Sequence, residues 1–149
     1  MKRVWLVVVA MVVVLAVGVA VVVAGYLRQP STDEATRFAD AFEAPAAWEL
    51  VAESVRNRAF FCVDGSCPSV MRRWELAAPP TPDQLHDLVA VEDVTTEGDC
   101  RPQPNVSGAF VTLCAAEATR GGLQLEVRVS GPAADGPRRF SATLLVEPD

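Results

Sequence analysis

The sequence has few of the residues from which metal sites and nucleophilic active sites are built. It contains one histidine, His86, so a site with several histidine ligands is excluded. No serine stands in a G-x-S-x-G or S-x-x-K motif, and no glycine-rich phosphate loop is present. The acidic residues are scattered and lack the spacing of a calcium loop. We therefore expect a non-enzymatic protein without catalytic residues, metal or cofactor, and an exposed, uninvolved His86.

Positive charge is also scarce beyond the N-terminus. Lys2 is the one lysine, and it stands with Arg3 ahead of a long apolar run. After that run, eleven arginines face nineteen acidic residues, a net charge near −8 at pH 7. This balance argues against nucleic acid as a partner and against charge-driven docking on anionic lipid.

The apolar run extends from Val4 to Ala24 and contains neither a charged side chain nor a proline. At about 1.5 Å per residue it spans roughly 30 Å, the thickness of the hydrocarbon core of a bilayer. Trp5 and Tyr26 stand at its two ends, where aromatic side chains favour the membrane interfaces. The run therefore predicts a transmembrane helix, with the bilayer as a partner through residues 4–24.

The charges around the run predict its orientation. Lys2 and Arg3 precede it, whereas Asp33 and Glu34 follow Arg28, so the positive-inside bias places the N-terminus in the cytoplasm. A cleaved signal peptide ending at Ala24 is the alternative, but signal cores are shorter, at about 7–15 residues. We expect a single-pass protein of the plasma membrane, with a cytoplasmic tip at 1–3, an anchor at 4–26, a juxtamembrane linker and helix at 27–44, and an extracytoplasmic domain at 45–149.

Beyond the anchor, apolar periodicity predicts a small α+β domain. Residues 31–44 form a helix with a Ser31–Glu34 capping box and an apolar stripe that packs on the domain. A second helix at 82–90 starts at Thr81, and we expect it to cover one face of an antiparallel sheet. Strict alternation over 123–130 and 140–147 marks two strands of a meander. Further strands are expected at 48–56 (where a helix is the alternative), 59–63, 69–76, 91–96 and 109–116.

Four cysteines in an exported domain indicate two disulfides. Three pairings are possible, and we favour Cys62–Cys67, which closes a hairpin, and Cys100–Cys114, which pins a loop to a strand. A zinc site and a thioredoxin-like redox pair both favour C-x-x-C spacing, which is missing. A redox role for Cys62 and Cys67 stays open as an alternative.

The layout resembles that of single-pass exported proteins of high-GC Gram-positive bacteria. The resemblance is carried by the Trp48 strand, the segment from Cys62 to Val70, the later cysteine pair and the preference for arginine over lysine. It implies no particular activity. We expect a membrane-anchored extracytoplasmic binding or accessory domain of the cell envelope that acts on an envelope or membrane protein partner. The alternatives are a small-ligand-binding or sensing module and a thiol–disulfide redox protein.

Overall fold

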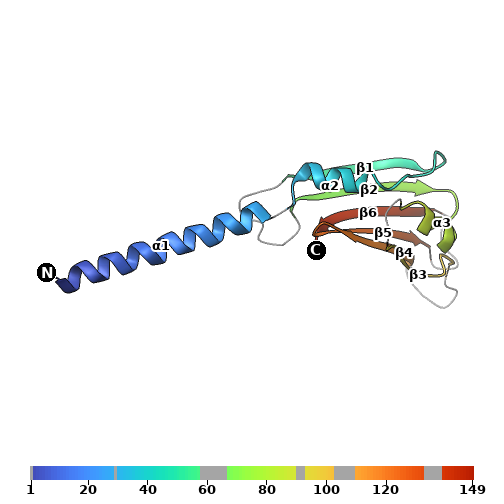
Figure 1. The fold of residues 1–149 in the computed structure, drawn as a ribbon. Coiled ribbons are helices and arrows are strands. Elements are labelled where there is room, and N and C mark those ends of the chain that lie inside the picture. The colour runs from blue at the N-terminus through green and yellow to red at the C-terminus, as the bar shows by residue number, and fades with distance from the viewer. Residues whose placement is uncertain (1, 29, 58–66, 90–92, 103–109, 133–138) are drawn as a thin grey trace.

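A computed structural model describes residues 2–28, 30–57, 67–89, 93–102, 110–132 and 139–149. Figure 1 shows a long N-terminal helix, α1 (Lys2–Arg28), that projects from a small domain built on one sheet. Within these residues the domain also contains two short helices, α2 (Thr32–Ala39) and α3 (Pro82–Asp87). The predicted strand at 59–63 lies outside the described residues.

The helix α1 is apolar along nearly its whole length. Within the described part of the chain it is the one helix long and apolar enough to cross a membrane. Trp5 and Tyr26 lie on this continuous helix, and at 1.5 Å per residue they are about 30 Å apart along its axis. The predicted apolar helix is therefore confirmed as an element of the fold.

The sheet is antiparallel and has six strands in the order β1-β2-β6-β5-β4-β3. Its strands are β1 (Glu49–Arg56), β2 (Ser69–Leu76), β3 (Thr95–Gly98), β4 (Val111–Arg120), β5 (Leu123–Gly131) and β6 (Phe140–Pro148). The predicted meander is confirmed as β4-β5-β6. The hairpin of β1 and β2 joins the sheet beside β6, so β1 forms one outer edge and the short β3 the other.

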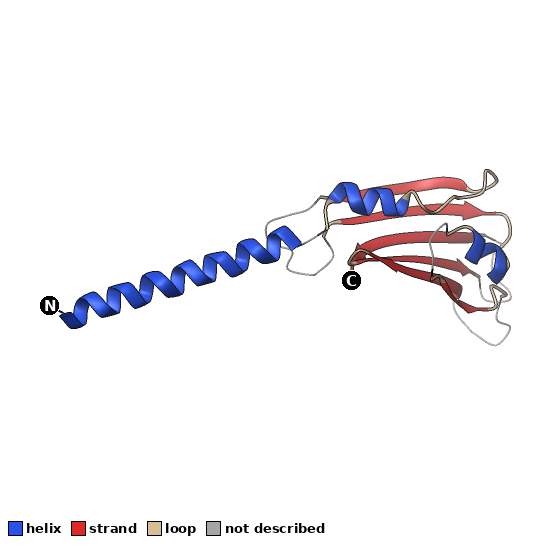
Figure 2. Ribbon diagram, in the orientation of Figure 1, coloured by secondary structure: helices blue, strands red, loops and turns tan. Residues whose placement is uncertain are grey.

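One face of the sheet carries the hydrophobic core. Alternate residues of β5 and β6 are buried on this face, as the period-two pattern predicts. The two short helices pack on this face of the sheet (Figure 2). Helix α2 lies over β2, β5 and β6, and α3 contacts β3 and β4. The largest fully buried side chains are Val70, Leu85, Leu125, Val127, Val129, Leu144 and Val146.

The helix that covers the centre of the sheet differs from the expected one. We expected this role for a helix at 82–90, but α3 has six residues and lies toward the β3 edge. The cover is α2, which buries Ala35, Phe38 and Ala39. Its apolar stripe packs on the domain as predicted, so the core extends across the expected boundary at residue 45.

Both short helices begin as predicted but end early. Ser31 and Thr81 each form a complete capping box, with Glu34 and Gln84 respectively. The segments that follow α2 and α3 then contact each other. Phe42 forms an isolated bridge with Val89, and the Glu43 amide donates to the Leu88 carbonyl (3.0 Å). In longer helices, the backbone N–H and C=O groups that form this pairing would instead be hydrogen-bonded within each helix. Strand β3 also differs from the expected strand at 91–96, because it starts later, at Thr95.

Candidate binding surfaces

The bond between Cys100 and Cys114 is present, as predicted. Cys114 lies on β4 opposite Gly98, the last residue of β3, and Cys100 follows two residues later. The bond therefore fastens the chain after β3 to the neighbouring strand. Gly98 has φ +82°, and a Cβ there would lie 2.5 Å from the Leu113 carbonyl oxygen, so only glycine fits this crossing.

The other predicted pair cannot be placed in the same way. Cys62 lies outside the described residues, so the Cys62–Cys67 bond stays a prediction. Cys67 is itself a disulfide cysteine, and none of the described cysteines is free.

His86 lies on α3 with about half of its side chain exposed, as the sequence predicts. Its Nδ1 is 3.6 Å from an Asp87 carboxylate oxygen, which is also exposed. Among the described residues, no three or more His, Cys, Asp or Glu side chains are grouped so that they could hold a metal ion.

Arg72 links three elements on the core side of the sheet. It lies on β2, where its Nε donates to Glu53 of β1 (2.7 Å) and its Nη2 donates to Asp40, just after α2 (2.8 Å). Burial lowers the pKa of Arg72, but hydrogen bonds to Glu53 and Asp40 and the charges of both carboxylates outweigh it. The pKa therefore lies above its usual value. This network connects the outer strand to the covering helix.

The opposite face of the sheet, here called the open face, carries polar side chains on its central strands. Glu117 of β4 stands opposite Glu126 of β5, and Arg128 donates to Glu126. This hydrogen bond and the charge of Glu126 raise the pKa of Arg128, and Glu117 and Glu147 raise it further. The guanidinium thus offsets part of the repulsion between directly opposed carboxylates.

The outer strand β1 exposes a set of apolar side chains. All eight of its residues are exposed, including Leu50 (51%), Val51 (45%) and Val55 (44%). Leu50 and Val55 stand opposite the buried Trp74 and Val70, so they share the face that carries the core. Val51 sits at a β-bulge, which disturbs the regular pairing. We call Leu50, Val51 and Val55 the outer-strand patch.

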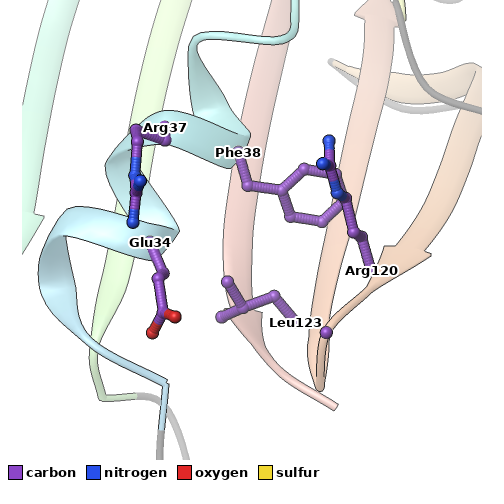
Figure 3. A pocket seen from close by; sticks show the side chains of 6 residues that line it. Glu34, Arg37, Phe38, Arg120 and Leu123 are labelled. Carbon is purple, nitrogen blue, oxygen red and sulfur yellow. The ribbon is translucent and has the colours of Figure 1, made fainter.

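A pocket of about 440 Å³ lies between α2 and the turn that joins β4 to β5. Figure 3 shows Arg37 and Arg120 on opposite sides of Phe38 and Leu123. Phe38 and Leu123 belong to the core, so they give the pocket an apolar floor. The lining residues are Glu34, Arg37, Phe38, Arg120, Gly121 and Leu123.

A wider pocket of about 570 Å³ lies at the other end of the sheet. It is formed by the segment that leads into α3 and by the chain around Cys100, with Asp83, Asp99 and Arg101 among its lining residues. Proline rings make up much of the remaining wall, since Pro79, Pro80, Pro82 and Pro102 all line it.

The chain matches no family model, and comparison with curated proteins and with solved structures found no match either. Function must therefore be argued from these surfaces alone.

Sequence reasoning did not find the outer-strand patch or the pocket beside α2. For β1, the spacing of Trp48, Val51, Ala52 and Val55 left a helix and a strand both possible, and it does not indicate whether a strand lies at an edge or in the centre of a sheet. For the pocket, Arg37 and Arg120 are 83 positions apart, and only the packing of α2 on the sheet brings them together.

Proposed function

We propose that the protein is a membrane-anchored, extracytoplasmic binding domain of the cell envelope that engages a protein partner without catalysing a reaction. Residues 4–24 hold it in the plasma membrane, and the positive charge of Lys2 and Arg3 keeps the N-terminus in the cytoplasm. The domain beyond the anchor would then meet its partner in the membrane or outside it.

The outer-strand patch is the observation that carries this proposal. Among the described strands β1 has a neighbour on one side only, and the backbone groups along the other side of such an edge can pair with an extended segment of another chain. Leu50, Val51 and Val55 would gain from burial in such a contact, since apolar side chains contribute about 25 cal/mol per Å² removed from water. The other edge, β3, has only four residues.

Photocrosslinking in intact cells tests this function. A photoreactive amino acid is placed at Val51 in β1, and in a matched control at Thr95 in β3, which is also an exposed edge position. We expect a discrete protein adduct from Val51 and none from Thr95. Equal adducts from both positions, or none from position 51, would contradict a specific contact at β1.

The polar substitution Val51→Asp provides a second measurement. It introduces a charge at a position whose side chain is already exposed, so the melting temperature of the purified protein should change little. We expect the adduct formed from a photoreactive residue at position 55 to disappear in this variant, because a buried unpaired charge opposes association.

The topology has its own test. Protease added outside intact cells should digest the domain and leave a membrane-embedded fragment that contains α1. Recovery of a soluble protein that starts near Gly25 would instead show cleavage and remove the anchor from the proposal.

A small-ligand-binding role is supported by the proline-walled pocket between the start of α3 and Cys100. Its volume of about 570 Å³ lies in the range typical of ligand sites. A ligand that raises the melting temperature of the wild-type protein, but not that of an Arg101→Gln variant, would favour this function. A redox role for Cys62 and Cys67 would instead require a folded dithiol after reduction.

A further inference from the structure

We propose that the pocket beside α2 binds the phosphate of an anionic phospholipid from the bilayer in which α1 is anchored. This inference rests on the proposed anchoring of α1, and it concerns a different surface from the outer-strand patch. It assigns a lipid site to a domain whose overall charge is negative.

The position of the pocket follows from the chain itself. Thr32, the first residue of α2, comes four residues after Arg28, the last residue of α1. Four residues span at most about 14 Å, so α2 begins close to the end of the membrane helix. The apolar run ends at Ala24, so Arg28 is about 6 Å further along the axis and reaches the headgroup layer.

The turn at Gly121 lies at this same end of the sheet. Glu34, in the first turn of α2, lines one pocket with Gly121, so the two segments are neighbours. Figure 1 shows α1 joining the domain at the end where β6 finishes and β5 begins. A headgroup at the foot of α1 can therefore reach the pocket without any change in the fold.

Two guanidinium groups supply the positive charge. Neither Arg37 nor Arg120 forms an ion pair within the described part of the chain. Arg37 uses its Nε to donate to the Asp33 carbonyl oxygen (3.3 Å), and its two terminal nitrogens have no hydrogen bond to a described residue. A planar guanidinium can donate two parallel hydrogen bonds to phosphate oxygens, which a lysine cannot do.

Of the remaining lining, Phe38 and Leu123 fit the apolar part of a lipid, whereas the Glu34 carboxylate repels an anion and has to be outweighed by the two guanidinium groups. The Glu34 carboxylate accepts a hydrogen bond from the Ser31 amide (2.6 Å), which holds it at the start of α2. Phe38 and Leu123 form an apolar floor between the two arginines (Figure 3), where the glycerol and the first methylene groups of a lipid could lie. A free phosphate ion would gain nothing from that floor, and this favours a lipid over the ion.

Titration of the full chain with lipid tests the site. The protein is purified in an uncharged maltoside detergent, phosphatidylglycerol is added, and native mass spectrometry measures the bound lipid. We compare the wild type with the pair Arg37→Gln/Arg120→Gln. The control pair Arg73→Gln/Arg139→Gln removes the same charge from two exposed positions that do not line this pocket.

We expect the first phosphatidylglycerol to bind the wild type and the control pair equally. Binding to the Arg37→Gln/Arg120→Gln pair should be roughly 25-fold weaker, about fivefold for each arginine. If the double variant fails to fold, each single variant should show the fivefold loss. Zwitterionic phosphatidylcholine should bind more weakly than phosphatidylglycerol to the wild type.

Two results would overturn the inference. Equal affinity of the Arg37→Gln/Arg120→Gln pair and the wild type would mean that lipid contacts α1 alone. Displacement of phosphatidylglycerol by an equal concentration of inorganic phosphate would mean that the site takes the free ion. Because this titration needs no protein partner, its failure is distinct from a failure of crosslinking at β1.

Discussion

Breaking the Cys100–Cys114 bond should remove a large part of the stability of the domain. The two residues are 14 positions apart, so the bond closes a ring of about 15 residues, for which chain entropy predicts a contribution of about 3 kcal/mol. Small domains have total free energies of unfolding of about 5–15 kcal/mol. We therefore expect reduction of this bond to lower the melting temperature by roughly 10–15 °C.

The measurement uses full-length protein in detergent with Cys62→Ala and Cys67→Ala, so that the Cys100–Cys114 bond is the only disulfide that can be reduced. Replacing Trp5 with Phe leaves Trp48 and Trp74, which contact each other and Phe42, as fluorescent reporters of the domain. Unfolding is followed with and without reductant. Identical melting temperatures would refute the reasoning, because the ring would then not constrain the unfolded chain.

Three further substitutions test the packing. Phe38→Ala should lower the free energy of unfolding by about 3–5 kcal/mol in a urea titration, because it empties a buried site under α2; a loss below 1 kcal/mol would mean that α2 is not part of the core. Asp40→Asn should lower the free energy of unfolding by less than about 1 kcal/mol, and this loss should shrink as salt is added, because the Asp40 side chain in this ion pair with Arg72 is more than half exposed; a loss independent of salt would contradict an ion pair. Gly98→Ala should lower the free energy of unfolding by about 1–3 kcal/mol through backbone strain, and the clash of the new Cβ with β4 should lower it further. The control Gly121→Ala has φ +61° but open space, so only its strain of about 1 kcal/mol remains, and equal costs for the two glycines would contradict the close approach at β3.

Local signals in the sequence were enough to predict many of the elements. Capping boxes at Ser31 and Thr81 specify where helices begin, because both hydrogen-bond partners lie within four residues of each other. The alternation in β5 and β6 predicts their buried sides for the same reason, since each strand carries its own pattern. The pairing of Cys100 with Cys114 follows from a short separation along the chain.

Arrangements that depend on distant segments were not predictable. Nothing near β2 indicates that it pairs with β6 rather than remaining in a separate hairpin. The early ends of α2 and α3 depend on the bridge between Phe42 and Val89, which are 47 positions apart. The pocket beside α2 likewise joins Arg37 to Arg120, and no local pattern of residues reports such a meeting.

The direction of β1 limits how copies of the protein can associate. β1 runs parallel to β6, because each is antiparallel to β2, and both strands finish at the end of the sheet where α1 joins. With α1 in a bilayer, neighbouring molecules present their free edges in the same direction. An antiparallel ladder between two such edges would require one molecule to be inverted, and parallel pairing is less stable per residue. Anchoring of α1 as proposed would therefore disfavour pairing between the β1 strands of two copies, while a segment of another chain that runs the opposite way could still pair with β1.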